Sequence, residues 1–183
     1  MTKLRADAHR NRERLIDTAT AAFAAADGTT VSLEAIARDA GVGIGTLYRH
    51  FPSREALVEA VHRAGLAEVS ESAQALLQDN SPVAALRLWM DRYAAFVATK
   101  KGMADSLRAL FAAGTMHPND TRTRITGAVD TLLRAGGADG SLRTDVPAED
   151  VVSGLLGVLL ASHSPEQAHR LLDLLVDGLV ATR

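Results

Sequence analysis

Cysteine is absent from the 183 residues of this chain, and aromatic side chains make up only 4% of them. Without cysteine, neither a disulfide framework nor a thiolate metal site nor a cysteine nucleophile is available. No apolar run approaches the length that a bilayer requires, and the charged N-terminus lacks the apolar stretch of a signal peptide. We therefore expect a soluble, cytoplasmic protein that does not enter a membrane.

The residues that are abundant favour helices. Ala, Leu, Glu and Arg dominate, whereas the β-branched and aromatic residues that form alternating strands are scarce. Hydrophobic residues make up 47% of the chain and charged residues 23%, which fits one mid-sized domain or two small domains that share a core. The sequence therefore predicts an all-α protein with about nine helices.

Hydrophobic periodicity and capping residues predict the limits of these helices. Asp27-Gly28 is expected to end the first helix, Gly41 to stop the second in a left-handed conformation, and Ser81-Pro82 to begin the fifth. The segment 135–145 is rich in glycine and is expected to be a loop. The expected helices are 8–26, 33–40, 44–51, 54–78, 82–100, 103–113, 119–135, 148–162 and 165–181.

The most informative stretch is SLEAIARDAGVGIGTLYRHF, residues 32–51, in which two short helices are joined by a tight turn that contains glycine. This is the spacing of a helix-turn-helix motif. Ile36 and Ala37 on the first helix are expected to pack against Leu47 on the second and to lock the pair. The polar face of the second helix then stays exposed, as insertion into the major groove of DNA requires.

The exposed face of this second helix carries groups that suit phosphates and base edges. Thr46, Tyr48, Arg49 and His50 supply hydroxyls, a cation and an imidazole. Gly45 lets the duplex approach the backbone closely. The alternative for Tyr48 is that it is a core aromatic residue.

Two helix starts and the N-terminus add further candidate DNA contacts. Ser32 precedes one helix, and Ser53 and Arg54 begin another; a helix N-terminus attracts phosphate through its unpaired amides and its dipole. The basic segment from Lys3 to Arg14 is expected to follow the DNA backbone or enter the minor groove as a disordered arm. The alternative is an ordinary solvated run of charges.

The run LEAIARDAGVGIGTLYRHFPSREAL, residues 33–57, resembles the signature of the TetR family of bacterial repressors. The resemblance implies an N-terminal three-helix DNA-binding domain (1–52), a connecting fourth helix (53–78) and an all-helical effector-binding and dimerisation domain (79–183). It also implies repression rather than activation. The partners implied are a double-stranded DNA operator, an unknown small-molecule effector and a second copy of the chain.

The resemblance implies two kinds of DNA contact on the second helix of the motif. The residues implied to touch the DNA backbone are Thr46, Tyr48 and His50, and those implied to face bases are Ile44, Gly45 and Arg49. Arg54 matches a position that is usually a lysine contacting phosphate. Leu33 and Glu34 depart from the polar or basic contacts of some relatives. Ile44 cannot donate a hydrogen bond, so we expect it to pack on a thymine methyl group and Arg49 to read guanine.

The helix expected at 82–100 has apolar side chains on most of its faces, which predicts a central position in the C-terminal domain. We expect a pocket for an apolar ligand beside it. The alternative is that its aromatic residues, at helical spacing, are plain core. The predicted lining residues are Trp89, Tyr93, Phe96, Leu107 and Phe111, with Arg92, Arg108 or His117 as polar anchors.

The helices expected at 148–162 and 165–181 carry more leucine and valine than one small domain needs. Gly154 and Gly157 would let another backbone come close. These features predict a homodimer held together by a four-helix interface of the last two helices of each copy. The alternative is that both helices only close the core of their own chain.

The sequence also bears on two other classes of function. An enzyme is disfavoured because the glycines at 41, 43 and 45 follow no strand and precede no P-loop lysine, and because the nearest approach to metal-ligand spacing is His163 with His169. We therefore expect no catalysis, metal or cofactor. The second class is a DNA-binding regulator without a ligand, whose C-terminal half only dimerises or recruits a partner.

Overall fold

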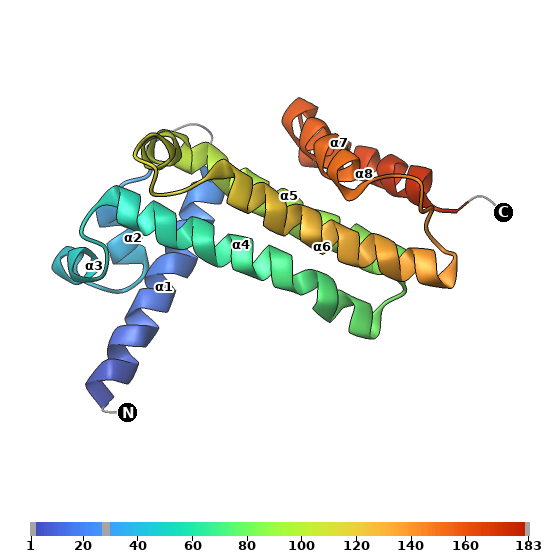
Figure 1. Cartoon of the computed structure of the whole chain (residues 1–183). Coiled ribbons are helices and arrows are strands. Elements are labelled where there is room, and N and C mark those ends of the chain that lie inside the picture. Colours follow the sequence, from blue (N-terminus) through green and yellow to red (C-terminus); the bar gives the residue numbers. More distant parts are fainter. Residues whose placement is uncertain (1–2, 27–29, 182–183) are drawn as a thin grey trace. The chain divides into compact units, whose positions relative to one another are not determined.

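The computed structural model describes residues 3–26 and 30–181, and within these ranges it contains eight α-helices and no strand (Figure 1). The all-α prediction is confirmed. None of the helices in these ranges combines the length and apolar character needed to span a membrane. The helices are α1 (Lys3–Ala25), α2 (Leu33–Asp39), α3 (Ile44–His50), α4 (Arg54–Asp79), α5 (Pro82–Ala112), α6 (Pro118–Asp139), α7 (Ala148–Ala161) and α8 (Pro165–Leu179).

The chain divides into two compact units, and both α4 and α5 contribute to each of them. The first unit comprises Met1–Gly65 and Val97–His117, so it holds α1, α2, α3, the start of α4 and the end of α5. The second unit comprises Leu66–Phe96 and Pro118–Arg183 and holds α6, α7 and α8. The end of α5, which the sequence analysis grouped with the C-terminal half, thus packs with the N-terminal helices.

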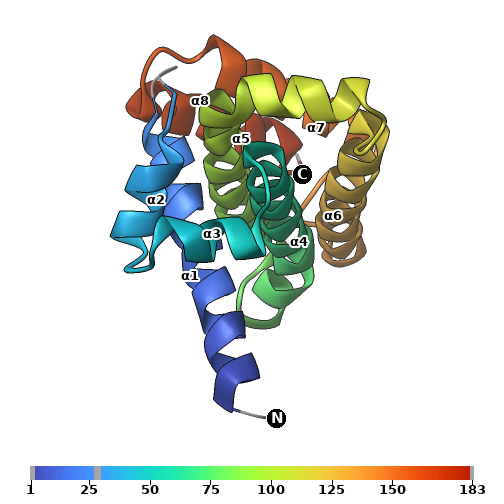
Figure 2. The ribbon, with the colours of Figure 1, turned by 90° about the vertical axis from the view of Figure 1, so that its left-hand side faces the viewer.

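The core of the first unit brings α1, α2 and α3 into mutual contact, and Figure 2 shows α2 and α3 beside α1. On α1, Leu15, Ala19 and Phe23 are fully buried, as their spacing of four residues predicts. Ile36 of α2 and Leu47 of α3 join the same cluster of buried side chains. This apolar cluster gives the two short helices the support that their own length cannot supply.

Helix α1 begins at Lys3, earlier than the predicted start at residue 8. The expectation of a disordered basic arm over Lys3 to Arg14 is therefore wrong, because the segment forms the first turns of α1. Its basic residues stand within a helix that Leu15 anchors in the core. The expected helix end at Asp27-Gly28 lies outside the described residues; α1 itself ends at Ala25.

Helix α5 runs unbroken from Pro82 to Ala112, so the prediction of two separate helices, 82–100 and 103–113, is wrong. Gly102 occupies the expected break, but it is buried. A Cβ atom placed on it would lie 2.6 Å from the carbonyl oxygen of Phe23. The glycine therefore permits close contact between α1 and α5 rather than a turn, and the structure has eight described helices where about nine were expected.

Helix α6 also continues past its predicted end, through Gly136 to Asp139, so the prediction of a loop over 135–145 is wrong in its first part. Gly136 is buried, and a Cβ atom placed on it would lie 2.4 Å from the side chain of Leu142. The turn comes at Gly140 instead, which has a φ of +75°. As in α5, a glycine within a helix serves tertiary packing.

In the second unit, α6 contacts α7 and α7 contacts α8. The segment after α6 is attached to the end of α8 by an isolated antiparallel bridge between Leu142 and Val180. Ser164 caps the start of α8, where its hydroxyl oxygen accepts a hydrogen bond of 3.2 Å from the N–H of Gln167. The capping bond holds the start of the last helix, and the bridge holds the residue that follows its end.

Candidate nucleic-acid interface

The turn between α2 and α3 has a geometry that depends on glycine. Gly41 adopts a φ of +68°, which confirms the predicted left-handed stop. Its N–H donates to the carbonyl oxygen of Arg38 at 3.0 Å, and the N–H of Val42 donates to that of Ala37 at 2.9 Å. Because these bonds satisfy the last carbonyls of α2, the turn is closed and holds α3 in a fixed direction.

Helix α3 is held from one side and exposed on the other. Leu47 is fully buried, and Phe51, directly after the helix, is 2% exposed. On the outer side Ile44 is 37% exposed and Tyr48 45% exposed, and Arg49 is also exposed. The alternative that Tyr48 is a core residue is therefore wrong. The free face thus presents an aromatic hydroxyl, a cation and an aliphatic group. A helix anchored in this way can enter a groove of DNA.

Gly45 has no neighbours that would explain a glycine at this position. Apart from its chain neighbours and the backbone of its own helix, a Cβ atom placed there would meet no atom of the described residues within 4 Å, and the backbone conformation does not require glycine. Glycine in a helix costs about 0.5–1 kcal/mol relative to alanine. The absence of a side chain therefore has no benefit inside the described protein and suits the close approach of an outside molecule.

A basic group from α1 lies at the end of α3. The guanidinium carbon of Arg12 on α1 lies 5.3 Å from the centroid of the Phe51 ring, and the ring of the half-buried His50 lies 6.3 Å from the same centroid. Arg12 thus lies beside the end of α3 rather than in a separate arm. Sequence alone gives no signal of this contact, because it joins residues that are far apart in the chain.

Ser32 and Ser53 both act as helix caps. The Ser32 hydroxyl oxygen accepts from the N–H of Ala35 at 3.3 Å, and the Ser53 hydroxyl oxygen accepts from the N–H of Ala56 at 3.2 Å. Ser32 is exposed, and its hydroxyl also donates to Glu34, which lowers the pKa of that carboxyl group. Each serine satisfies one of its helix's free amides, and the amides that remain can bind an anion.

Arg54, the first residue of α4, points to backbone carbonyls within the first unit. Its Nη1 donates to the carbonyl oxygen of Val31 at 2.6 Å, and its Nη2 donates to that of Gly102 at 3.3 Å. The guanidinium carbon lies 5.4 Å from the centroid of the Phe23 ring. The resemblance implied a phosphate contact for this residue, whereas both of its Nη atoms donate to carbonyl oxygens of the protein.

The exposed start of α1 carries ion pairs within the helix. Arg10 pairs with Asp7, and His9 lies 3.0 Å from Glu13. Exposed pairs of this kind contribute little to stability because water screens them. Arg10 can therefore exchange its partner for a DNA phosphate at small cost.

Three of the predicted ligand-lining residues lie together in the second unit. Trp89 is fully buried, and its ring stacks on that of Tyr93 with centroids 5.4 Å apart and planes 6° apart. The Tyr93 ring lies 6.4 Å from Phe96, and burial raises the pKa of Tyr93. The indole N–H of Trp89 donates to the carbonyl oxygen of Val69 at 2.8 Å. This row of rings belongs to the packed core of the unit.

Of the other predicted ligand residues, Arg92 is exposed in the second unit, and the remaining four belong to the first unit. Leu107 is buried in its core, and Phe111 packs against the same cluster. Arg108 is exposed and pairs with Asp105, and His117 is exposed. The structure therefore divides the predicted lining between the two units.

A buried histidine near a half-buried lysine in the first unit was not predicted. His62 on α4 is 2% exposed, and burial, followed by the charge of Lys100, lowers its pKa to about 4. Burial also lowers the pKa of Lys100 on α5. The sequence did hold a signal: His62 stands four residues from both Val58 and Leu66, on the buried face of α4.

Two helices locked by a glycine turn, with one face anchored and the other open, define a helix-turn-helix transcriptional regulator that binds DNA. Comparison with protein families gives the particular group. Residues 15–61 match the model described as bacterial regulatory proteins, tetR family, and residues 81–181 match the model described as transcriptional regulator SbtR-like, C-terminal domain. The chain belongs to the TetR family.

Solved structures agree with this assignment. A TetR transcriptional regulator from Streptomyces coelicolor has 42% identity and a TM-score of 0.85, covering 94% of this chain and 99% of its own. A TetR regulatory protein from Mycobacterium vanbaalenii has 32% identity and a TM-score of 0.75, covering 97% and 99%. A gamma-butyrolactone receptor shares the fold at 21% identity with a TM-score of 0.62, covering 96% and 91%. No curated protein sequence matches the chain.

Proposed function

We propose that this protein is a ligand-responsive repressor that binds a palindromic operator as a homodimer, with α3 as the recognition helix. The observation that carries the proposal is the contrast between the two faces of α3. Leu47 is fully buried, whereas Tyr48 is 45% exposed beside the exposed Arg49. The anchored face keeps the helix rigid, and the free face presents the groups that read and bind DNA.

The proposed contacts follow from the chemistry of each exposed group. Arg49 donates to the acceptor atoms of guanine, and the exposed methyl groups of Ile44 pack on a thymine methyl group. Gly45 admits the duplex to the helix backbone. The proposed contacts to the sugar-phosphate backbone come from the hydroxyl, imidazole and amide groups of Thr46, Tyr48, His50, Ser32 and Ser53.

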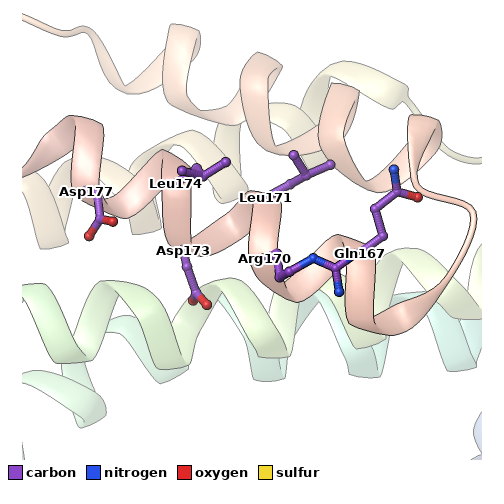
Figure 3. Close-up of a pocket in the computed structure, with 6 residues that line it drawn as sticks. All are labelled: Gln167, Arg170, Leu171, Asp173, Leu174 and Asp177. Atoms are coloured by element: carbon purple, nitrogen blue, oxygen red, sulfur yellow. The ribbon is translucent and has the colours of Figure 1, made fainter.

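The last two helices supply the proposed dimer interface. Leu160 on α7 is 72% exposed and Leu174 on α8 is 65% exposed, although both are leucines. A groove along α8 includes Leu171 and Leu174, which extend from the same side of the helix in Figure 3, with Asp177 at one end. Pairing this surface with its copy would bury the exposed leucines in a two-fold interface.

Two-fold symmetry also explains how a small reading unit achieves useful affinity. A rigid dimer presents two recognition helices about 34–36 Å apart, the length of one turn of DNA, to the two halves of a palindrome. A ligand that favours a different spacing then weakens operator binding by thermodynamic linkage. The proposed effector is an apolar small molecule, because three of the predicted lining residues, Trp89, Tyr93 and Phe96, are aromatic. The gamma-butyrolactone receptor shares only the fold with this chain. Its name indicates that a protein of this fold can bind a small molecule, which supports the proposal of an effector.

The second candidate is a regulator without a ligand, and one observation favours it. Trp89 is fully buried, stacked on Tyr93 and satisfied by the carbonyl oxygen of Val69. A tryptophan in this position acts as a core residue. Screening apolar small molecules for an increase in Tm, and then for loss of operator affinity, separates the two candidates, because only a sensor couples the two effects.

Selection of bound duplexes from a random DNA pool tests the proposed function. We expect a palindrome whose half-sites are one helical turn apart and whose affinity falls steeply with salt. An enriched single half-site bound by a monomer would contradict the dimer. Failure to enrich any sequence above non-specific binding would contradict operator recognition by α3.

A further inference from the structure

Arg54 connects three segments of the first unit. Its guanidinium donates to the carbonyl oxygen of Val31, just before α2, and to that of Gly102 in the middle of α5, at 2.6 and 3.3 Å. The same group lies 5.4 Å from the centroid of the Phe23 ring on α1. The segments are 23 and 48 residues away from Arg54 in the chain, so the contacts are tertiary.

The surroundings of Gly102 show that this junction is tightly packed. A Cβ atom on Gly102 would lie 2.6 Å from the carbonyl oxygen and 2.9 Å from the Cα of Phe23. The backbones of α1 and α5 therefore touch at the residue whose carbonyl Arg54 binds. We name this group of residues, Phe23, Val31, Arg54 and Gly102, the α5 junction.

We propose that Arg54 is a positioning residue, which fastens the helix-turn-helix to α5 through the α5 junction and makes no contact with a DNA phosphate. The carbonyl of Val31 directly precedes the capped start of α2, so a bond to it sets where α2 enters the motif. Helix α3 is in contact with α2 and α1 and follows their position. Arg54 thereby affects DNA binding indirectly, because it fixes the position of the backbone that carries α2 and α3.

The chemistry of the side chain suits this role. A guanidinium is planar and has several fixed donors, so one arginine can bind two carbonyl oxygens and stack on a ring at the same time. Lysine, with a single ammonium group on a flexible stem, cannot reproduce that arrangement. Turning Arg54 outward to a phosphate would break both hydrogen bonds and remove it from the Phe23 ring.

The test compares four variants in binding to the duplex selected with the wild-type protein, over a range of salt concentrations. Arg54→Met removes both the hydrogen bonds of the junction and the positive charge. Arg54→Lys removes the same arrangement of hydrogen bonds but keeps the charge. Gly102→Ala disturbs the junction without changing any charge. Arg63→Met is the control, because Arg63 is an exposed arginine on the same helix, paired with Glu59.

We expect Arg54→Met, Arg54→Lys and Gly102→Ala each to weaken operator binding at least about tenfold, the effect of losing one charge-assisted hydrogen bond. The slope of log affinity against log salt stays that of the wild type in all three, and the double variant Arg54→Met with Gly102→Ala is no weaker than the worse single one. Arg63→Met binds within about twofold, since it leaves the junction intact.

A phosphate contact gives the opposite pattern. Arg54→Met would then reduce the salt slope by about 0.9 per protomer, Arg54→Lys would retain affinity, and Gly102→Ala would have no effect on the slope or on binding. Lower Tm values without loss of affinity in the folded protein would also overturn the proposal, because they indicate a purely structural role.

The proposed role of Arg54 rests on the proposed binding of DNA through α3. Hydrogen exchange tests the junction separately from DNA binding. The junction predicts faster amide exchange in α2 and α3 for Arg54→Met and Gly102→Ala than for Arg63→Met, with or without DNA. If the wild type selects no duplex but this exchange pattern appears, operator recognition fails and the junction stands. Unchanged exchange in α2 and α3 overturns the junction itself.

Discussion

The indole N–H of Trp89 on α5 donates a 2.8 Å hydrogen bond to the carbonyl oxygen of Val69 on α4. The same carbonyl accepts from the Ser72 hydroxyl at 2.9 Å, and the Trp89 ring stacks on Tyr93. Both the polar and the apolar parts of the tryptophan are thus used within the second unit. Trp89 consequently joins α4 to α5 as a structural residue.

Trp89→Phe tests this assignment. The substitution keeps an aromatic ring for Tyr93 but removes the indole donor and part of the ring volume. Since Ser72 still satisfies the Val69 carbonyl, we expect a loss of about 1–3 kcal/mol in the free energy of unfolding, mainly from packing and one hydrogen bond. Urea titration measures it. Unchanged stability would contradict a structural role, and Tyr93→Phe, which keeps the stack, is the control.

Sequence reasoning predicted the parts of the fold that local chemistry determines. The left-handed φ of Gly41 follows from its place after a short helix, and the burial of Leu47 follows from helical periodicity. Both features depend on residues within one or two turns. For Tyr48 the sequence left both an exposed and a core position open, and the structure has it 45% exposed.

The features that sequence reasoning missed depend on distant partners. Gly102 and Gly136 stood at or near expected breaks, yet each lies inside a helix where Phe23 or Leu142 leaves no room for a Cβ atom. The inward orientation of Arg54 depends on the carbonyls of Val31 and Gly102. Periodicity describes which face of a helix is buried, but not which residue it meets.

Gly45→Ala is expected to separate folding from DNA binding. Alanine has room at this position and is a better helix former, so the free energy of unfolding rises by about 0.5–1 kcal/mol. The added methyl group also obstructs the close approach of the duplex, and operator affinity falls. Urea titration and binding to the selected duplex measure the two effects.

Gly127→Ala is the matched control for that variant, because Gly127 is exposed within α6 and a Cβ atom there also meets nothing within 4 Å. It is expected to gain stability without changing operator affinity. If Gly45→Ala binds the operator as tightly as the wild type, DNA does not approach the backbone at this position.

Arg49→Met and Tyr48→Phe are expected to weaken binding in different ways. Loss of the arginine costs about 1–3 kcal/mol and relaxes the preference for guanine at one position of each half-site. Loss of the tyrosine hydroxyl weakens binding to every sequence alike, because phosphates are the same in all of them. Repeating the duplex selection with each variant measures this. A wild-type preference in Arg49→Met would exclude Arg49 as a base-reading residue.

His62 is expected to make stability depend on pH. Its pKa is about 4 in the folded protein and 6.5 without the burial and the charge of Lys100, so the unfolded chain binds the proton first. Stability is therefore full above pH 6.5 and declines as the pH falls toward 4, by up to about 3 kcal/mol. Urea titrations between pH 7.5 and 4 measure the decline.

His62→Gln removes the titrating group and should flatten this part of the pH profile. His9→Gln is the control, because the His9 side chain is 67% exposed on α1. It should leave the decline unchanged. A profile that is equally steep in His62→Gln and in the wild type would show that other groups cause the loss.

Leu160→Glu and Leu174→Glu are expected to dissociate the dimer. The two leucines are 72% and 65% exposed on α7 and α8, so a single chain gains little from them, whereas a charge buried in a two-fold interface is repeated by its symmetry mate. Sedimentation should show monomers, and affinity for the palindrome should fall toward that of one half-site. Leu88→Glu is the control: Leu88 is 43% exposed on α5 and should leave the dimer intact. Dimers that persist in both interface variants would place the contact between copies elsewhere on the chain.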